Sequence, residues 1–195
     1  MGRQKAFSRE KLLSKTLELF REKGYADSSL RDIQEVTGLN KSSIYAEFQD
    51  KEDLFRCSLR HYLHQWDIVN PLMKEPLGWN NIVDFLTGGA ACESGKGCFV
   101  ANSIRELQVL PQSSAQLVRR HMTRSRLQIQ KNLEAAGLKE NSKDIAAVVQ
   151  TFSVGMAIEK NLGQRRDLQR QVEIFLGSIQ GSLTKAWPLQ KWFSS

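Results

Sequence analysis

Residues 24–55 read GYADSSLRDIQEVTGLNKSSIYAEFQDKEDLF, and this stretch decides the fold. Ser28 or Ser29 can cap a helix that carries apolar residues at three-residue spacing, because a hydroxyl there accepts a bond from a free backbone N–H. The sequence TGLN at residues 37–40 then forms a tight turn. Two short helices joined by a glycine-containing turn predict a helix-turn-helix, which lays its second helix into the major groove of DNA.

The second of these short helices has an inward and an outward face. Asn40 can cap it, and Ile44 and Phe48 lie one turn apart toward the core. A rotation of about 100° per residue then places small or hydrogen-bonding side chains outward, where they suit close approach to DNA. We expect base or phosphate contacts from Asn40, Lys41, Ser42, Ser43 and Tyr45, and a backbone clamp from Lys51. The alternative is a partly packed surface tyrosine beside solvated lysines.

The same stretch resembles the DNA-binding region of the TetR family. The resemblance is carried by a Gly-aromatic pair, two hydroxyl residues, an Ile in the second helix, Gly-hydrophobic in the turn, and then Tyr-x-x-Phe-x-x-Lys-Glu-x-Leu-Phe. It is strong over about residues 9–56 and extends to the rest in architecture. It implies that DNA is touched by Ser28 or Ser29, Lys41, Ser42, Ser43, Tyr45 and Lys51, with Tyr45 and Lys51 on phosphates.

The chain departs from the family pattern at two places. Ser42 stands where the family often has Gly, and Ala46-Glu47 stand where a pair such as His-Tyr is common. An acidic side chain at position 47 can exclude some sequences or accept from a cytosine amine, but we expect it to turn toward a neighbouring lysine. We also expect phosphate or minor-groove contacts from a basic N-terminal arm that contains Arg3, Lys5, Arg9 and Lys11.

The overall composition bounds the class of protein. The chain has 195 residues, 41% of them apolar, and a formal net charge of +7, which predicts one or two small folded domains with an anionic partner. Three cysteines without a secretory signal favour a reducing cytoplasm. No apolar run approaches the length of a membrane span, so we expect no membrane partner.

Apolar spacing of three and four residues recurs along almost the whole chain and predicts an all-α protein. We expect an N-terminal three-helix helix-turn-helix domain over residues 1–52, followed by a helical ligand-binding and dimerisation domain over residues 53–195. Outside the helix-turn-helix pair, the expected helices span about residues 8–23, 51–69, 79–86, 98–110, 113–136, 142–162 and 167–187.

The last two expected helices carry strong apolar stripes that need covering. Members of the TetR family use such helices to form a symmetric four-helix bundle from two chains, so the resemblance implies a homodimer that binds a near-palindromic operator. Burial within one chain is the alternative. The expected interface residues are Phe152, Met156, Val172, Phe175, Ile179 and Leu183.

A second local resemblance concerns an effector. The segment KGCFVANSIREL at residues 96–107 resembles one found in a branch of the TetR family. In that branch the helices matching residues 79–162 enclose a small-molecule pocket, which implies an unknown small-molecule effector. Ordinary core packing is the alternative for every candidate. The candidate lining residues are Trp66, Phe85, Phe99, Asn102, Ile104, Met122, Phe152 and Met156.

Cys92 and Cys98 offer an alternative mode of control, since a thiol sensor can respond to oxidants or electrophiles. Lys96 would lower a nearby thiol pKa, yet Cys98 at the start of a helix is equally compatible with simple burial. Zinc usually requires closer cysteine pairs and two more ligands, so we expect no metal and no cofactor.

The function predicted from these observations is a sequence-specific DNA-binding transcriptional regulator. Repression relieved by a small-molecule effector is what the resemblance implies. An enzyme is the main rival class, but the chain lacks a P-loop, a G-x-G-x-x-G after a strand and a G-x-S-x-G elbow. A helical interaction protein that binds no DNA is the other rival.

Overall fold

The computed structural model describes residues 8–91, 98–161 and 167–184, and these ranges contain helices and no strand. The predicted all-α class is therefore confirmed. In chain order the elements are α1 (Arg9–Lys23), α2 (Leu30–Thr37), α3 (Lys41–Tyr45), α4 (Lys51–Val69), the 3₁₀ helix η1 (Pro71–Met73), α5 (Trp79–Ala91), α6 (Phe99–Arg105), α7 (Gln112–Ala135), α8 (Ser142–Asn161) and α9 (Leu168–Thr184).

Two helices differ from their predicted lengths. α5 continues past the predicted end at residue 86, through the exposed Gly88 and Gly89, to Ala91. α6 ends at Arg105, short of the predicted residue 110. After it the chain tightens into bonds between residues three apart, and Pro111 follows as the N-cap of α7.

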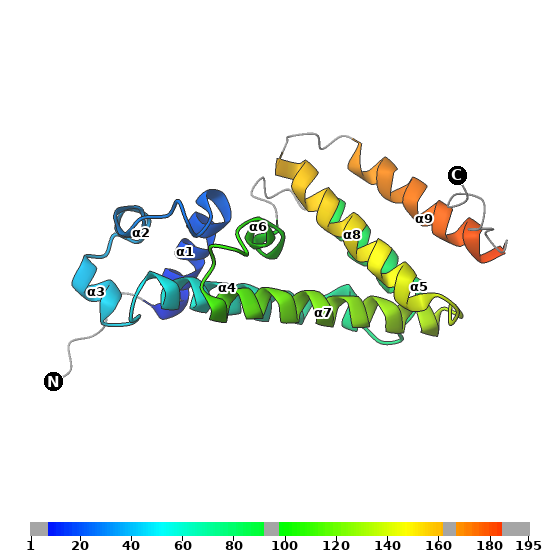
Figure 1. Ribbon diagram of the computed structural model, residues 1–195, viewed down its shortest axis with the longest axis horizontal. Helices are drawn as coiled ribbons and strands as arrows, with labels where there is room; N and C mark the ends of the chain where they lie inside the picture. Colours follow the sequence, from blue (N-terminus) through cyan, green and yellow to red (C-terminus); the bar gives the residue numbers. More distant parts are fainter. Residues whose placement is uncertain (1–7, 92–97, 162–166, 185–195) are drawn as a thin grey trace.

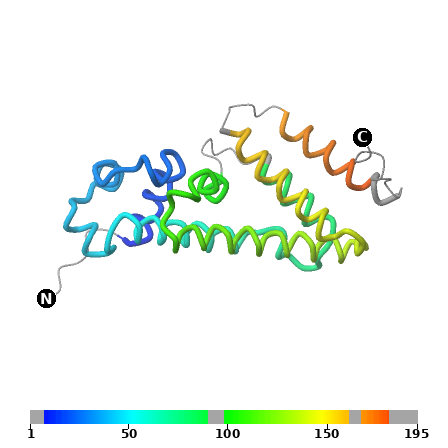
Figure 2. The backbone as a smooth tube through the Cα atoms, viewed as in Figure 1, coloured from blue at the N-terminus to red at the C-terminus, as the bar shows by residue number. Residues whose placement is uncertain are grey.

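The helices form an elongated molecule (Figure 1). α1, α2 and α3 gather at one end, while α4 and α7 run side by side from that end toward the other. α5, α8 and α9 make up the far end, as the continuous trace also shows (Figure 2). α6 lies between the two ends and contacts α1, α4, α7 and α8.

Two hydrophobic clusters hold the fold together. The N-terminal core is formed by the first four helices, α1 through α4, together with the starts of α6 and α7. Phe55 at its centre meets the rings of Phe20, Tyr25 and Phe99 edge to face, at centroid distances of 4.9, 5.1 and 5.3 Å. The C-terminal core joins η1, α5, α7, α8 and α9. Because Phe99 belongs to the N-terminal core, that core is completed by residues far beyond position 52.

A buried asparagine ties the η1–α5 connection to α7. The side chain of Asn132 has no exposed surface. Its oxygen accepts from the Gly78 N–H at 3.0 Å and from Asn81 Nδ2 at 2.9 Å, and its amide donates to the carbonyls of Leu72 and Gln128, both at 2.9 Å. The polar atoms of this side chain are thus all used inside the protein.

Replacing Asn132 with leucine is expected to lower the free energy of unfolding by about 2–4 kcal/mol, because it leaves several buried polar groups without partners. Urea unfolding monitored by circular dichroism measures the loss. Gln169, an exposed residue of α9, supplies the control variant Gln169→Leu, which should change stability little. An Asn132→Leu protein as stable as the wild type would contradict the structural role of this cluster.

The described helices include none that is both long and apolar enough to cross a membrane.

Candidate DNA-binding site

The helix-turn-helix is built by local capping. Ser29 caps α2: its hydroxyl accepts the Asp32 N–H at 3.2 Å, and its own N–H donates to the Asp32 carboxylate at 2.7 Å. α2 ends at Gly38, whose φ of 74° is the left-handed conformation that glycine adopts readily. Asn40 caps α3 by accepting the Ser43 N–H at 2.8 Å. The predicted caps and turn are confirmed.

The carboxyl of Asp32 predicts a pH dependence. Its hydrogen bond from Lys23 Nζ at 2.5 Å, followed by those from Ser29, holds the Asp32 pKa well below its ordinary value. Because the pKa is depressed in the folded state, the ionised carboxylate stabilises the fold above the unfolded pKa of about 4, and this contribution is lost as the pH falls further.

The unfolding free energy of the wild type should therefore exceed that of Asp32→Asn above about pH 5, and the difference should shrink below about pH 4. Urea unfolding over a pH series measures it. Asp27→Asn, at an exposed aspartate of the turn between α1 and α2, is the control and should show a much smaller difference. A difference between wild type and Asp32→Asn that is independent of pH would refute the linkage.

α3 presents one face to the core and another to solvent. Ile44 and Phe48 are 1% and 2% exposed, whereas Tyr45 is 37% exposed. Asn40, Lys41 and Ser42 are exposed as well, and Ser43 is half-buried. The Lys41 ammonium lies 5.8 Å from the centroid of the Tyr45 ring. The side chains predicted to read DNA therefore lie together on the outward face.

Ser28 and Lys51 differ from their neighbours in this set. Ser28 is 2% exposed and donates its hydroxyl to the Gly24 carbonyl at 2.6 Å, so the prediction that it touches DNA is wrong and Ser29 is the exposed serine of the pair. Lys51 donates to the carbonyls of Tyr25 and Ser28 at 2.8 and 2.9 Å. An ammonium has three donors, and two of those of Lys51 serve the fold.

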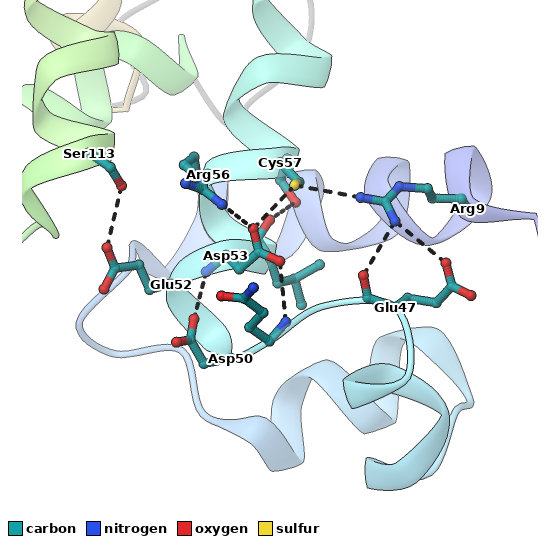
Figure 3. Close-up of polar contacts among 11 residues, drawn as sticks. Arg9, Glu47, Asp50, Glu52, Asp53, Arg56, Cys57 and Ser113 are labelled. Carbon is teal, nitrogen blue, oxygen red and sulfur yellow. Dashed lines mark hydrogen bonds and ion pairs between the residues drawn. The ribbon is translucent and has the colours of Figure 1, made fainter.

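Arg9 anchors the end of the recognition segment to α1 and α4. Its guanidinium donates to the backbone oxygen of Glu47 at 3.3 Å and pairs with the Glu47 carboxylate at 3.5 Å (Figure 3). It also lies 4.5 Å from the centroid of the Phe48 ring. Glu47 thus turns toward Arg9. We predicted that Arg9 belongs to a basic N-terminal arm, but it lies in α1 and makes these contacts. Arg3 and Lys5 lie outside the described residues.

Cys57 lies in the same network (Figure 3). Arg9 Nη2 is 3.7 Å from its sulfur, and the thiol donates to Asp53 Oδ1 at the same distance. Burial, together with the negative charge of Asp53, raises the pKa of the Cys57 thiol. Asp53 in turn pairs with Arg56 at 2.5 Å. Sequence reasoning missed this cluster because Arg9 comes from α1, whereas Asp53, Arg56 and Cys57 lie on α4.

The eight predicted effector residues are divided between the two cores. Phe99, Ile104 and Met122 belong to or pack against the N-terminal core, and Asn102 Nδ2 donates to the Arg21 carbonyl of α1 at 3.0 Å. Phe85, Phe152 and Met156 pack in the C-terminal core, where Trp66 meets the Phe85 ring at 6.3 Å. The structure does not bring all eight together. The four in or beside the N-terminal core hold α6 and α7 against the DNA-binding region.

Most of the predicted dimer-interface residues face inward. Val172, Met156 and Ile179 are 0%, 4% and 9% exposed in the single chain, and the rings of Phe152 and Phe175 stack at 4.0 Å. The side chain of Leu183 lies outside the described residues. The prediction is therefore corrected: these stripes cover the C-terminal core. Other apolar residues of the same helices are exposed, namely Val148 at 54%, Ile158 at 39% and Ile174 at 61%.

Groups of three or more His, Cys, Asp or Glu side chains that could hold a metal ion are absent among the described residues.

The model of the bacterial regulatory proteins of the tetR family matches residues 12–56, which contain the helix-turn-helix and its caps. The structure of a cysteine variant of the TetR-family regulator CifR, complexed with a 26-base-pair operator duplex, covers 90% of this chain and 98% of its own, with a TM-score of 0.77 and 25% identity. Residues 12–56 therefore form a TetR-family DNA-binding region, and the chain as a whole has the fold of the TetR-family regulator CifR.

Two further proteins are similar to the chain. The transcriptional repressor ComR of Escherichia coli K12 is 34% identical over 113 residues, which is 54% of each chain. The reduced form of E. coli NemR has a TM-score of 0.73 at 18% identity and covers 89% of this chain and 95% of its own. The chain spans about half the length of the curated relatives it matches.

Proposed function

We propose that this protein is a sequence-specific DNA-binding transcriptional repressor of the TetR family. The observation that carries the proposal is the division of α3 into a buried side, Ile44 and Phe48, and an exposed side that presents Lys41, Ser42 and Tyr45. The proposal is supported by the similarity to ComR, a repressor, and to CifR, which was solved on operator DNA. The proposal includes the predicted division of the chain into a DNA-binding domain over residues 1–52 and a ligand-binding and dimerisation domain over residues 53–195.

Each exposed group has a role that its chemistry suits. Lys41 supplies a point charge for a phosphate, and the Tyr45 phenol donates to a second phosphate oxygen. Asn40, Ser42 and Ser43 carry short polar side chains that reach base edges when α3 lies in the major groove. The remaining proposed contacts, Ser29 and Lys51, flank α3 at the start of α2 and α4.

Selection of duplexes from a random pool by the full-length protein, followed by footprinting, tests the proposal. We expect one enriched near-palindromic sequence whose affinity falls steeply with salt, because phosphate contacts release counterions. Enrichment of no sequence at any salt concentration would refute a sequence-specific regulator.

We further propose that the protein acts as a homodimer through the exposed sides of α8 and α9. Val148, Thr151, Gly155 and Ile158 recur every three or four residues on α8 and are exposed. Ile174 is a large exposed apolar residue of α9. This stripe of small and apolar groups suits close helix packing against a second copy, and a two-fold dimer would place two copies of α3 on a near-palindrome.

An effector that releases the repressor is the remaining part of the proposal. The candidate lining residues that stay together in the structure are Trp66, Phe85, Phe152 and Met156, in and beside the C-terminal core. A small apolar or aromatic molecule suits such a lining. The proposal includes no metal, cofactor or membrane partner.

Redox or electrophile sensing is a second candidate, favoured by the surroundings of Cys98. The hydroxyl of the half-buried Tyr62 donates to the Cys98 sulfur at 3.3 Å, and removal from solvent beside this cysteine raises the pKa of Tyr62. Oxidation of the sulfur would disturb this contact between α4 and the start of α6. CifR was solved as a cysteine variant and NemR in a reduced form. Cys92 lies outside the described residues.

Mild treatment with hydrogen peroxide should abolish DNA binding by the wild type and by Cys57→Ser, but not by Cys98→Ser. Fluorescence anisotropy with the selected duplex measures the binding, and a thiol reductant should restore it if the product is a sulfenic acid or disulfide. Equal loss in the wild type and in Cys98→Ser would eliminate sensing through Cys98.

A further inference from the structure

Glu106 connects α6 to the turn between α1 and α2. Its carboxylate accepts the backbone N–H of Tyr25 at 2.7 Å and that of Ala26 at 3.0 Å. Neither N–H lies in a helix, so the carboxylate provides partners that the turn itself does not. The contact joins the end of α6 to the DNA-binding region across about 80 residues of sequence.

The turn is shaped to receive this carboxylate. Gly24 has a φ of 82°, and the two N–H groups that follow it converge on one carboxylate, as in the backbone nests that bind anions. A Cβ atom at Gly24 would lie 2.7 Å from both carboxylate oxygens of Glu106. Glycine therefore serves two needs here, a left-handed backbone and room for the side chain.

Glu106 departs from a local rule of helix chemistry. It is the C-cap residue of α6, where the helix dipole favours a cation and disfavours a carboxylate by about 0.3–1 kcal/mol. Such departures concentrate at functional positions, where a more distant interaction compensates for them. The two charge-assisted bonds to Tyr25 and Ala26 are that interaction.

Lys51 holds the same turn from its other side. Its ammonium donates to the Tyr25 carbonyl at 2.8 Å and lies 4.3 Å from the centroid of the Tyr25 ring, which packs edge to face on Phe55. The Tyr25 backbone is thus bonded at its N–H to Glu106 and at its carbonyl to Lys51. The entry to α2 is fixed between a carboxylate of α6 and an ammonium of α4.

We propose that Glu106 is a positioning residue for DNA recognition. By holding the turn after α1 it orients α2 and α3 for base contacts, and it makes this orientation depend on the position of α6. The inference rests on the proposed function. Phosphate contacts tolerate small displacements, whereas base contacts require a defined geometry, so Glu106 should affect specific binding more than non-specific binding.

The test uses Glu106→Gln in the full-length protein, because a glutamine keeps the shape but has one oxygen for two N–H groups. Fluorescence anisotropy compares a duplex enriched by the wild-type protein with a scrambled duplex of equal length and composition. We expect a roughly tenfold loss of affinity for the enriched duplex and a change within about twofold for the scrambled one. Glu140→Gln, at an exposed glutamate of the α7–α8 turn, should change neither affinity.

Amide hydrogen exchange reports the contact without DNA. The N–H groups of Tyr25 and Ala26 should exchange faster in Glu106→Gln than in the wild type, while the core amides of α4 keep their protection. Gly24→Ala, which displaces the carboxylate from the other side, should reproduce both the faster exchange and the lower specificity.

The outcomes separate this inference from the proposed function. Faster exchange with an unchanged or higher ratio of specific to non-specific affinity would overturn the positioning role and leave the repressor proposal intact. An equal fall in both affinities would overturn it as well, since that pattern reflects a loss of folded protein. A wild type that enriches no duplex would instead overturn the proposed function, on which this role rests.

Discussion

The double variant Lys41→Ala/Tyr45→Ala is expected to lose affinity for its selected duplex by about 100-fold or more while remaining folded. Each residue should contribute about 1–3 kcal/mol of DNA contact, and both are exposed, so their removal leaves Ile44 and Phe48 in place. The slope of log affinity against log salt is negative, and it should become shallower by about 2, since a dimer loses the Lys41 phosphate contact twice. Fluorescence anisotropy over a salt series measures both quantities.

Two control variants sharpen this result. Lys139→Ala removes an exposed lysine at the α7–α8 turn and should leave the affinity and the salt slope unchanged. Tyr45→Phe keeps the ring and removes only the hydroxyl, so it isolates the hydrogen bond to phosphate. If the double variant bound the selected duplex as tightly as the wild type with the same salt slope, α3 would not be the surface that reads DNA.

The double variant Val148→Glu/Ile174→Glu is expected to convert the protein to monomers and to lower operator affinity by about 10²–10⁴-fold. Burying four carboxylates in a symmetric interface is strongly unfavourable, and a monomer loses the gain from binding two half-sites at once. Both positions are more than half exposed in the single chain, so folding of the protomer should be preserved. Sedimentation equilibrium measures the mass, and anisotropy measures the affinity.

Val69→Glu is the matched control for the dimer prediction. Val69 at the end of α4 is 68% exposed and lies outside α8 and α9, so this variant adds a carboxylate to an apolar surface without touching the proposed interface. It should remain dimeric and bind the operator normally. A Val148→Glu/Ile174→Glu protein that still sediments as a dimer would place the interface elsewhere.

The interface prediction shows where sequence patterns reach their limit. The strongest apolar stripe of a helix faces the largest nearby apolar surface, and in α8 and α9 that surface is the core of the same chain. Val172 and Ile179 were therefore expected between protomers but are buried within one. The weaker stripe, with Val148 and Ile174, became visible only once the inward side was known.

The effector candidates were divided for the same reason. Phe99 and Asn102 lie in the segment whose resemblance implied a pocket, yet Phe99 meets Phe55 edge to face and Asn102 bonds to the end of α1. A local resemblance indicates which helix a segment forms. It carries no information on which neighbour that helix packs against, because packing partners are set by the whole chain.

The amino-acid sequence alone determined the helical class, a cap at Ser28 or Ser29, the cap at Asn40 and the turn at Gly38, since hydroxyl, amide and glycine act on backbone groups within four residues. Only the tertiary structure decided the partners of Lys51, Arg9 and Glu106. Their charges reach across helices that lie far apart in the chain, and the choice among many possible partners depends on how the apolar faces pack.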